Sequence, residues 1–364
     1  MPQTATLRPT AAQAVGLPFP HSGRSRQWRV AQPTAQRRLQ VALGLLWLTD
    51  GALQLQPFMF TRAFATQIIA PNALGQPGPV AAPIRLAAHL IEPHAALFNT
   101  IAAAIQLSIG LGLMHRRSVR VALAGSFGWA LGVWWTGEGL GGLLTGAASP
   151  LTGAPGASLL YVLIGLIVWP RADSRTRHAT ACGLLGSRGA RGVWALLWTG
   201  FAALWLAPAN RAAGAVHDAI TAAPSGARWL SSIQHSAAAA AAGHGPEIAL
   251  GAAILSAAIA LAGLSKRFRT PTLIVSIAIA LIYFLIGQGM GGILTGSGTD
   301  PGSGPPLILL ALAIVATPPG TAARWQPMTA AATRMRTTDR PATEGVGPTG
   351  PVPALRVVMP TRPH

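Results

Sequence analysis

The chain has almost no cysteine and few charged residues. Its one cysteine, Cys182, cannot form a disulfide or a dithiol redox pair within one chain. Only 10% of the 364 residues are charged and 51% are hydrophobic, whereas about a quarter of the residues in soluble proteins are charged. This scarcity of charge points away from a soluble domain and toward an integral protein of the lipid bilayer.

Motifs of common catalytic sites are also missing. The sequence has no phosphate-binding loop, no nucleophile elbow with a His partner and no pair of catalytic carboxylates on one face. The net charge of +18 comes without the aromatic residues interleaved with basic ones that nucleic-acid binding favours. We therefore expect the basic residues to set membrane topology and to attract anionic lipid, with no nucleic acid as partner.

What the chain does have is a series of apolar stretches. Eight of them lie near residues 41–57, 95–114, 119–136, 156–169, 192–208, 246–264, 271–288 and 305–318. Several are shorter than the ~20 residues of a perpendicular transmembrane helix, but flanking Gly, Ser and Pro residues leave room to extend them. The sequence therefore predicts an all-α, polytopic membrane protein with eight transmembrane helices.

The distribution of Lys and Arg supports this number of spans. With the N-terminus in the cytoplasm, only four of the 27 basic residues fall on the outer side: Arg62, Arg85, Arg211 and Arg228. Cytoplasmic loops of membrane proteins accumulate basic residues, and the loss of one helix would invert every later loop. We therefore predict cytoplasmic N- and C-termini, and a cytoplasmic loop around Cys182.

An internal repeat organises the sequence. Residues 137–146 read GEGLGGLLTG and residues 287–296 read GQGMGGILTG, with seven identical positions at an offset of 150. Other pairs recur at offsets of 150 or 151: Arg116-Arg117 with Lys266-Arg267, His94 with His244, and Pro57 with Pro208. Each half has an even number of predicted spans, so the second half enters the membrane in the same orientation. Two parallel four-helix repeats, related by an axis along the membrane normal, are the predicted architecture.

The predicted organisation has five parts. They are a basic cytoplasmic tail without order (1–38), a first four-helix membrane repeat (39–170), a cytoplasmic linker (171–191), a second repeat (192–318) and another such basic tail (319–364). The tail over residues 1–38 lacks the apolar segment of a signal peptide. Residues 59–70 and 83–92 of the first outer loop, and their counterpart at 210–236, have helical apolar spacing, which suits helices on the membrane surface or short soluble helices that cap the spans.

Glycines four residues apart mark both repeated segments. They are Gly137, Gly141, Gly142 and Gly146 in the first, and Gly287, Gly291, Gly292 and Gly296 in the second. One interpretation is close packing of helix backbones in lipid, or a structural turn. The other is a helix break at the outer face whose loop lines a cavity, because lipid tolerates irregular backbone only where it is buried or wet.

Two acidic residues lie at predicted membrane depth. Asp50 falls within the first span, where the second half has Phe201, and Glu138 lies at the outer end of the third span, where the second half has Gln288. Ionisable groups in such places are costly and are therefore candidates for function. Asp50, Glu138 and Gln288 are candidate polar or proton-handling sites. The alternatives are a structural polar network for Asp50 and an ordinary interfacial carboxylate for Glu138.

Five of the nine histidines fall on the predicted outer side: His89, His94, His217, His235 and His244. His94 and His244 would face each other across the repeat axis if they were paired ligands, although duplication alone also produces such a pair. His89 and His94 straddle Pro93 and lack the spacing that places two imidazoles on one helical face. We therefore treat His94 and His244 as candidate outer-face ligands, expect neither haem nor a metal, and assign no metal site.

Residues 40–57, QVALGLLWLTDGALQLQP, resemble the opening helix of DoxX-like membrane proteins. Those proteins are four-span bundles, so the resemblance applies to about half of this chain, and VWALLWTGFAALWLAP at 193–208 keeps little of it. The resemblance implies a bacterial inner-membrane protein whose relatives are linked to quinone-coupled oxidation of sulfur compounds or to redox-stress partners. The single Lys among 27 basic residues indicates a GC-rich genome.

Three functions remain open on sequence alone. The first is an accessory membrane protein without catalytic activity, whose outer-face cavity binds a small lipophilic molecule or a membrane or redox protein partner. The second is a subunit of a quinone-linked membrane oxidoreductase, with Asp50 or Glu138 handling protons. The third is a transporter. Whether the protein is an enzyme stays open, and quinone is the one cofactor that the hypotheses name.

Overall fold

The fold comes from a computed structural model that describes residues 34–170, 183–265 and 267–315. All of them belong to one compact unit within Met1–Pro319. Cys182, the predicted tail at 319–364, and most of the predicted tail at 1–38 and linker at 171–191 lie outside the described residues.

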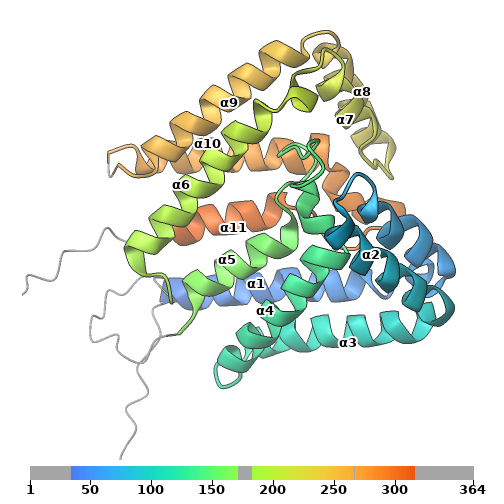
Figure 1. The fold of residues 1–364 in the computed structure, drawn as a ribbon. Helices are drawn as coiled ribbons and strands as arrows, with labels where there is room; N and C mark the ends of the chain where they lie inside the picture. The colour runs from blue at the N-terminus through green and yellow to red at the C-terminus, as the bar shows by residue number, and fades with distance from the viewer. Residues whose placement is uncertain (1–33, 171–182, 266, 316–364) are drawn as a thin grey trace, which may run out of the picture. The chain divides into compact units, whose positions relative to one another are not determined.

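The described residues form helices and no strands, which confirms the predicted all-α class (Figure 1). The first half has five α-helices: α1 (Thr34–Leu53), α2 (Gly78–Ile91), α3 (Ala95–Met114), α4 (Val119–Thr136) and α5 (Ala157–Val168). The second half has six: α6 (Gly186–Trp205), α7 (Ala215–Thr221), α8 (Arg228–Ala241), α9 (Gly245–Ala262), α10 (Arg269–Ile282) and α11 (Gly304–Val315). Short 3-10 and π turns join them: η1 (Pro57–Phe60), η2 (Phe64–Ile69), η3 (Ala70–Ala73), η4 (Glu92–His94), η5 (Gly139–Gly142), η6 (Pro208–Arg211), η7 (Tyr283–Gly287) and η8 (Gly289–Thr295).

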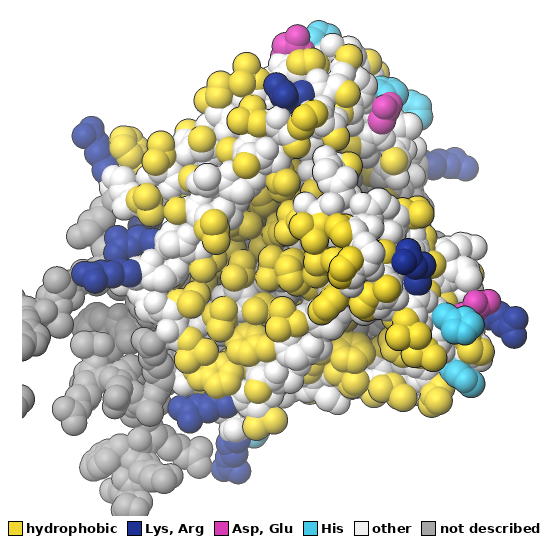
Figure 2. Space-filling model, viewed as in Figure 1, with side chains coloured by type: hydrophobic (Ala, Val, Ile, Leu, Met, Phe, Trp, Pro, Cys, Tyr) yellow, Lys and Arg dark blue, Asp and Glu magenta, His cyan; other side chains and the backbone are white. Residues whose placement is uncertain are grey.

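Three helical segments of the described chain are long and apolar enough to cross a membrane. They are Gly78–Met114, Gly245–Ala262 and Arg269–Gly287. Helices α5 and α11 are apolar but have only 12 residues each, and α1, α4 and α6 each include at least one Arg. Figure 2 shows hydrophobic side chains over the middle of one face and charged side chains mainly at its margins. These features indicate a membrane protein, while the number of eight spans stays a prediction.

Hydrogen bonds at the helix ends show which helices run in opposite directions. Arg37 on the first turn of α1 donates from Nη1 to Leu113 O at the end of α3, over 2.8 Å. Gln36 and Gln40 donate to Val168 O at the end of α5, over 3.1 and 2.8 Å. These side chains satisfy carbonyl groups that have no partner within their own helix. Helix α1 is therefore antiparallel to both α3 and α5.

Two helices begin inside segments predicted as tail and linker. Helix α1 begins at Thr34, inside the tail predicted for 1–38, because Gln36 and Arg37 find partners on α3 and α5. Helix α6 begins at Gly186, inside the linker predicted for 171–191, because its early residue Ala190 is buried in the core at 1% exposure. In both places tertiary contacts extend a helix into a polar, Arg-containing segment.

The outer loop of the first half folds into η1 to η3 and α2. The buried face of α2, including Val80, Ile84 and Ile91, packs with Met59 and Phe64 into a small apolar core of its own. The corresponding loop of the second half forms α7 and α8, which pack against each other. The predicted helical spacing in both loops is confirmed, and the buried face of α2 is covered by protein.

Candidate functional site

The two Gly-rich segments adopt the same left-handed backbone. Residues Gly139 to Gly142 have φ angles of 53°, 55°, 63° and 69°, and residues Gly289 to Gly292 have 52°, 59°, 67° and 70°. Side chains disfavour this conformation, so glycine suits it best. A Cβ atom at Gly141 would collide with the Pro155 carbonyl, and one at Gly291 with the Asp300 carbonyl. The glycines therefore build a tight turn at the end of a helix.

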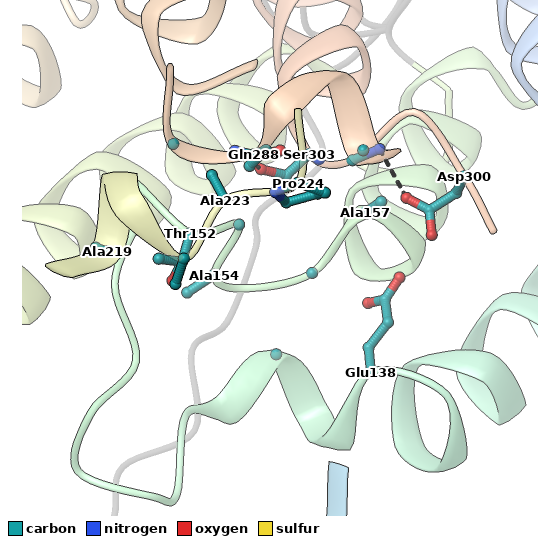
Figure 3. A pocket seen from close by; sticks show the side chains of 17 residues that line it. Glu138, Thr152, Ala154, Ala157, Ala219, Ala223, Pro224, Gln288, Asp300 and Ser303 are labelled. Carbon is teal, nitrogen blue, oxygen red and sulfur yellow. Dashed lines mark hydrogen bonds between the residues drawn. The ribbon is translucent and has the colours of Figure 1, made fainter. Parts of the chain in front are cut away.

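Both turns line one cavity of about 440 Å³, which we call the outer cavity (Figure 3). Glu138 and Gly141 come from the first turn, and Gln288 and Gly291 from the second. The loops before α5 and α11 and the end of α7 complete the wall. This arrangement agrees with the interpretation of the Gly-rich segments as cavity-lining loops, and it places both segments at the same end of the helices.

Glu138 and Gln288 hold the start of the last helix of each half. Glu138 Oε1 accepts hydrogen bonds from Ser158 N and Ser158 Oγ of α5, over 3.0 and 2.8 Å. Gln288 Oε1 accepts one from Ser303 N over 2.8 Å, and its Nε2 donates to Ser303 Oγ over 3.0 Å, just before α11. Such bonds satisfy N–H groups that a helix leaves free at its start. The Glu138 carboxylate thus makes hydrogen bonds within the protein, and its place at the membrane interface stays a prediction.

A second, inner cavity of about 80 Å³ adjoins the outer one. Glu138, Ala157 and Asp300 line both cavities, so the two meet at these residues. The wall of the inner cavity combines polar side chains with aromatic and aliphatic ones: Asp50, Gln54, Gln106, Tyr161, Ser158 and Thr299 with Trp47, Phe64, Ile68, Phe98 and Trp129. Helices α1, α3, α4 and α5 supply most of them.

Three carboxylates gather at these cavities. Asp50 is 4% exposed and accepts a hydrogen bond from Tyr161 Oη over 3.2 Å. Asp300 accepts from Thr299 Oγ1 over 2.9 Å and from Gly302 N over 2.7 Å. Figure 3 shows the carboxylates of Glu138 and Asp300 directed toward one another. No Lys, Arg or His is among the described residues that line either cavity, so none of these residues supplies a counter-ion there.

The electrostatic consequence is clearest for the two carboxylates in loops. Burial, together with the nearby Asp300, raises the pKa of Glu138 to about 8, against the opposing effect of its bonds with Ser158. Burial likewise raises the pKa of Asp300. Desolvation disfavours the charged form of a carboxyl group, and a neighbouring carboxylate adds to this effect. At neutral pH Glu138 therefore holds a proton for most of the time.

Several polar atoms around the inner cavity are buried without a hydrogen-bond partner in the structure. They are Gln54 Oε1, Gln106 Oε1, Glu138 Oε2 and Trp129 Nε1. Gln54 and Gln106 are 6% and 5% exposed. Buried polar groups in folded proteins nearly always have partners, and each exception calls for an explanation. Their convergence on one cavity marks it as a binding site for water or for a ligand.

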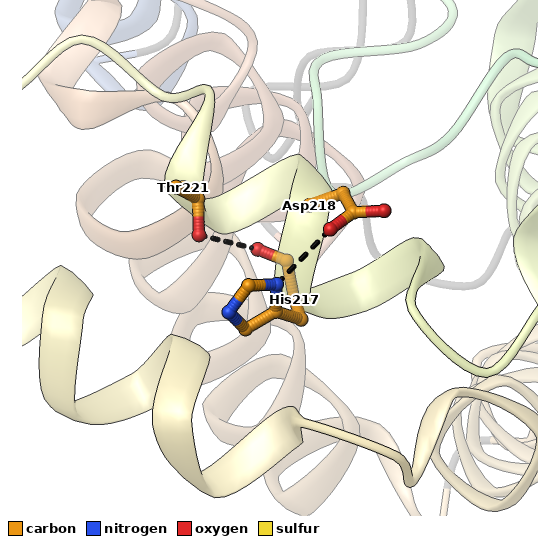
Figure 4. A network of polar contacts seen from close by, with 3 residues as sticks. All are labelled: His217, Asp218 and Thr221. Carbon is orange, nitrogen blue, oxygen red and sulfur yellow. Dashed lines mark hydrogen bonds and ion pairs between the residues drawn. The ribbon is translucent and has the colours of Figure 1, made fainter.

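The histidines predicted on the outer side do not form a comparable site. His94 and His244 are exposed and precede α3 and α9, each in its own half, and neither lines the outer or the inner cavity. His217 Nδ1 lies 3.0 Å from Asp218 Oδ1 on the surface of α7 (Figure 4). Among the residues described, no three His, Cys, Asp or Glu side chains are placed to hold a metal ion.

Sequence reasoning identified Asp50, Glu138 and Gln288 but missed Asp300, Tyr161, Gln54 and Gln106. Acidic residues are scarce, nine in the whole chain, and Asp300 follows the second Gly-rich segment closely. That scarcity was the available signal for Asp300. The two glutamines lie within or next to apolar helices, and only the packed structure shows that they face one cavity.

No protein-family model matches the chain, and comparisons with curated proteins and with solved structures return no match. The DoxX-like resemblance of residues 40–57 therefore stays a prediction.

Proposed function

We propose that this chain is an integral membrane protein of two parallel four-helix repeats, and that it binds a small molecule in the cavity between its two Gly-rich turns. The observation that carries the proposal is the outer cavity itself, because one turn from each half lines it. Two equivalent turns that meet around one space resemble the interface sites found between repeats of membrane proteins. We propose the bacterial inner membrane as the location, with this cavity on the outer face.

The positions of the helices support the duplication. Helices α2, α3 and α4 begin at Gly78, Ala95 and Val119, and helices α8, α9 and α10 begin 150 residues later, at Arg228, Gly245 and Arg269. The left-handed turns recur at the same offset. In the second half, Trp194 Nε1 in the middle of α6 donates to Ile259 O near the end of α9 over 3.1 Å. Gly245 N at the start of α9 donates to Ala213 O, which follows the end of α6, so this pair is antiparallel, as α1 and α3 are.

Binding without catalysis is the role that the cavity walls favour. The walls carry carboxylates, amides, hydroxyl groups and aromatic rings. These groups recognise a ligand by charge, hydrogen bonds and apolar contact, as in typical small-molecule sites. We therefore propose an accessory protein that presents or stores a small ligand, alone or together with a membrane partner.

A quinone-linked oxidoreductase subunit is the second candidate, and one observation favours it. The carboxylates of Asp50, Glu138 and Asp300 extend from the inner to the outer cavity, and such a series can pass the protons that a quinol releases on oxidation. Purified protein should then change the rate of quinol oxidation by a supplied electron acceptor. If neither wild type nor Asp50→Asn changes the rate of quinol oxidation, this candidate is removed.

Closing the outer cavity tests the proposed function. Ala222 is exposed and lines the cavity, so Ala222→Trp places an indole ring across it. Ala242→Trp is the matched control, because Ala242 is equally exposed and does not line the cavity. Native mass spectrometry of protein released from detergent should show a bound small molecule in wild type and in the control but not in Ala222→Trp. Identical spectra for all three would contradict the proposal.

A further inference from the structure

Once Glu138 is ionised, the inner cavity has more unpartnered hydrogen-bond acceptors than unpartnered donors. Gln54 Oε1, Gln106 Oε1 and Glu138 Oε2 are buried and unpartnered, and Asp50 has Tyr161 Oη as a donor to one oxygen. A ligand that suits this set must bring hydrogen-bond donors, positive charge or both. Gln54 follows α1 directly and Gln106 lies on α3, so two separate elements place amide groups at one cavity.

We propose that the inner cavity binds a small organic cation, an amine or a quaternary ammonium, between the carboxylates of Asp50, Glu138 and Asp300. This inference specifies the ligand class for the proposed binding function and rests on that function. The cation reaches the site through the outer cavity, which shares Glu138 and Asp300 with the inner one.

Electrostatics favours a cation over a neutral ligand. A buried carboxylate is costly unless a positive charge or several hydrogen bonds compensate it. Three carboxyl groups converge here, and all three are charged only after Glu138 has released its proton. The described residues lining the cavities include no Lys, Arg or His. A bound cation supplies the missing charge in a site of low dielectric, where the attraction is strong.

The shape and the walls favour an organic cation over a metal ion. Metal ions need ligands that converge within about 2.0–2.6 Å, and no three acidic, His or Cys side chains of the described chain are placed to do so. Trp47, Trp129, Phe64 and Phe98 line the cavity instead. Aromatic faces attract alkylammonium groups through the cation–π interaction.

The size of the cavity agrees with this ligand class. A buried water molecule needs roughly 10–15 Å³ of cavity volume, and the volume of the inner cavity is about 80 Å³. It can hold a few waters or one compact cation. Trp129 Nε1 is an unpartnered donor in the same wall, so a cation that also carries a hydroxyl oxygen matches the site better than a simple alkylammonium.

Protons compete with the cation for the same carboxylates. The titratable groups around the cavity are Asp50 on α1, Glu138 after α4, Tyr161 on α5 and Asp300 before α11. Because the pKa of Glu138 is raised to about 8, its carboxyl group is mostly protonated at neutral pH, and a cation must displace that proton. Affinity for the cation should therefore rise with pH.

Equilibrium binding to the purified full-length protein in detergent tests the proposal. The probes are choline, ethanolamine and tetramethylammonium, and 3,3-dimethyl-1-butanol serves as the neutral isostere of choline. We expect at least one cation to bind about tenfold or more tightly than the neutral alcohol, as desolvated cation–π and charge contacts allow. With one proton released for each cation, affinity should rise by up to about tenfold per pH unit between about pH 6 and about pH 8.

Three variants locate the site. Asp50→Asn and Glu138→Gln each remove a carboxylate at nearly constant volume, and each should weaken cation binding at least about tenfold, as loss of a buried charge pair does. Glu138→Gln should still fold, because Gln288 makes the equivalent bonds in the second half. Asp218→Asn is the matched control. It removes a carboxylate from the surface of α7 that contacts His217, and it should leave cation binding unchanged.

Two results would overturn the proposal. One is equal binding of choline and its neutral isostere, and the other is binding of none of the three cations by a folded protein, which leaves water as the content of the inner cavity. Neither result contradicts the proposed function if Ala222→Trp still removes a bound molecule from the outer cavity. If Ala222→Trp also has no effect on the bound molecule, the cation proposal and the proposed function are both contradicted.

Discussion

The two halves of the chain bury equivalent positions with opposite chemistry. Asp50, Gln54 and Asn99 are 4%, 6% and 0% exposed. Their counterparts at offsets of 151, 151 and 150 are Phe201, Trp205 and Ala249, which are 2%, 3% and 0% exposed. The second half therefore shows that this arrangement of helices is compatible with an apolar interior at all three positions.

The aromatic residues repeat the contrast. In the second half Trp194, Trp198 and Phe201 form a continuous row of tilted and edge-to-face ring contacts, with ring centroids 5.5 and 5.3 Å apart. In the first half Trp47 instead packs on Tyr161, with centroids 5.0 Å apart, and Tyr161 in turn binds Asp50. Burying a polar group costs free energy, whereas burying an apolar group does not. We infer that the first half keeps them for binding and that the second half serves mainly as a scaffold.

The Gly-rich turns are where the halves should behave alike. Gly141→Leu and Gly291→Leu should each destabilise the fold strongly, because both force a side chain into left-handed backbone and against a carbonyl group. The two contributions are about 1–2 kcal/mol for the conformation and roughly 1–3 kcal/mol for the collision. Thermal unfolding of both variants in detergent measures this. Tolerance of either substitution would contradict the equivalence of the turns.

Glu138 and Gln288 are where the halves should differ in pH dependence. The pKa of Glu138 is raised from 4.5 to about 8, so the folded state holds its proton more tightly than the unfolded state does. Its contribution to stability is then fully present below about pH 4.5 and is lost as pH rises through about 8. The melting temperature of wild type should fall over this window, and the fall should be smaller in Glu138→Gln.

The reciprocal variant is Gln288→Glu. It places a carboxyl group in the second half and should make the melting temperature fall more steeply with rising pH. An unchanged pH profile in both variants would refute the inward, desolvated placement of these two side chains.

The smallest expected difference concerns two equivalent tryptophans. Trp47 Nε1 donates to Ser126 Oγ over 2.9 Å, whereas Trp198 Nε1 is buried without a partner. Both changes to Phe lose ring volume, but only Trp47→Phe also breaks a hydrogen bond. It should be the more destabilising by about 1 kcal/mol. Chemical denaturation of the two variants gives the comparison, and a larger loss for Trp198→Phe would be the contrary outcome.

Local pattern was enough to predict much of the fold. The apolar stretches at 95–114 and 119–136 coincide with α3 and α4. The left-handed turns could not be predicted, because Leu140 and Met290 occupy a conformation that residues with side chains disfavour. Glycine spacing alone left open a packing contact or structural turn and a cavity-lining loop, and the structure shows tight turns against Pro155 and Asp300 that also line the outer cavity.

Only some residues of the candidate site could be predicted from the sequence. Asp50 and Glu138 stood out because charge is rare in apolar segments. Asp300 joins them through the packing of α11 on α5, which no local pattern encodes. Gln54 and Gln106 become informative only when the structure shows that both line the inner cavity and that their Oε1 atoms are buried without partners.

Labelling of equivalent cysteines tests the central claim most directly. Leu144 and Leu294, 53% and 40% exposed in the two Gly-rich segments, are replaced one at a time by Cys in a Cys182→Ser background. Intact cells are then treated with a membrane-impermeant maleimide, with Arg62→Cys as the outer-face control and native Cys182 as the cytoplasmic one. The account predicts that both positions are labelled and that Cys182 is not. Labelling of only one of the two, or of Cys182, would contradict parallel duplication around a shared outer cavity.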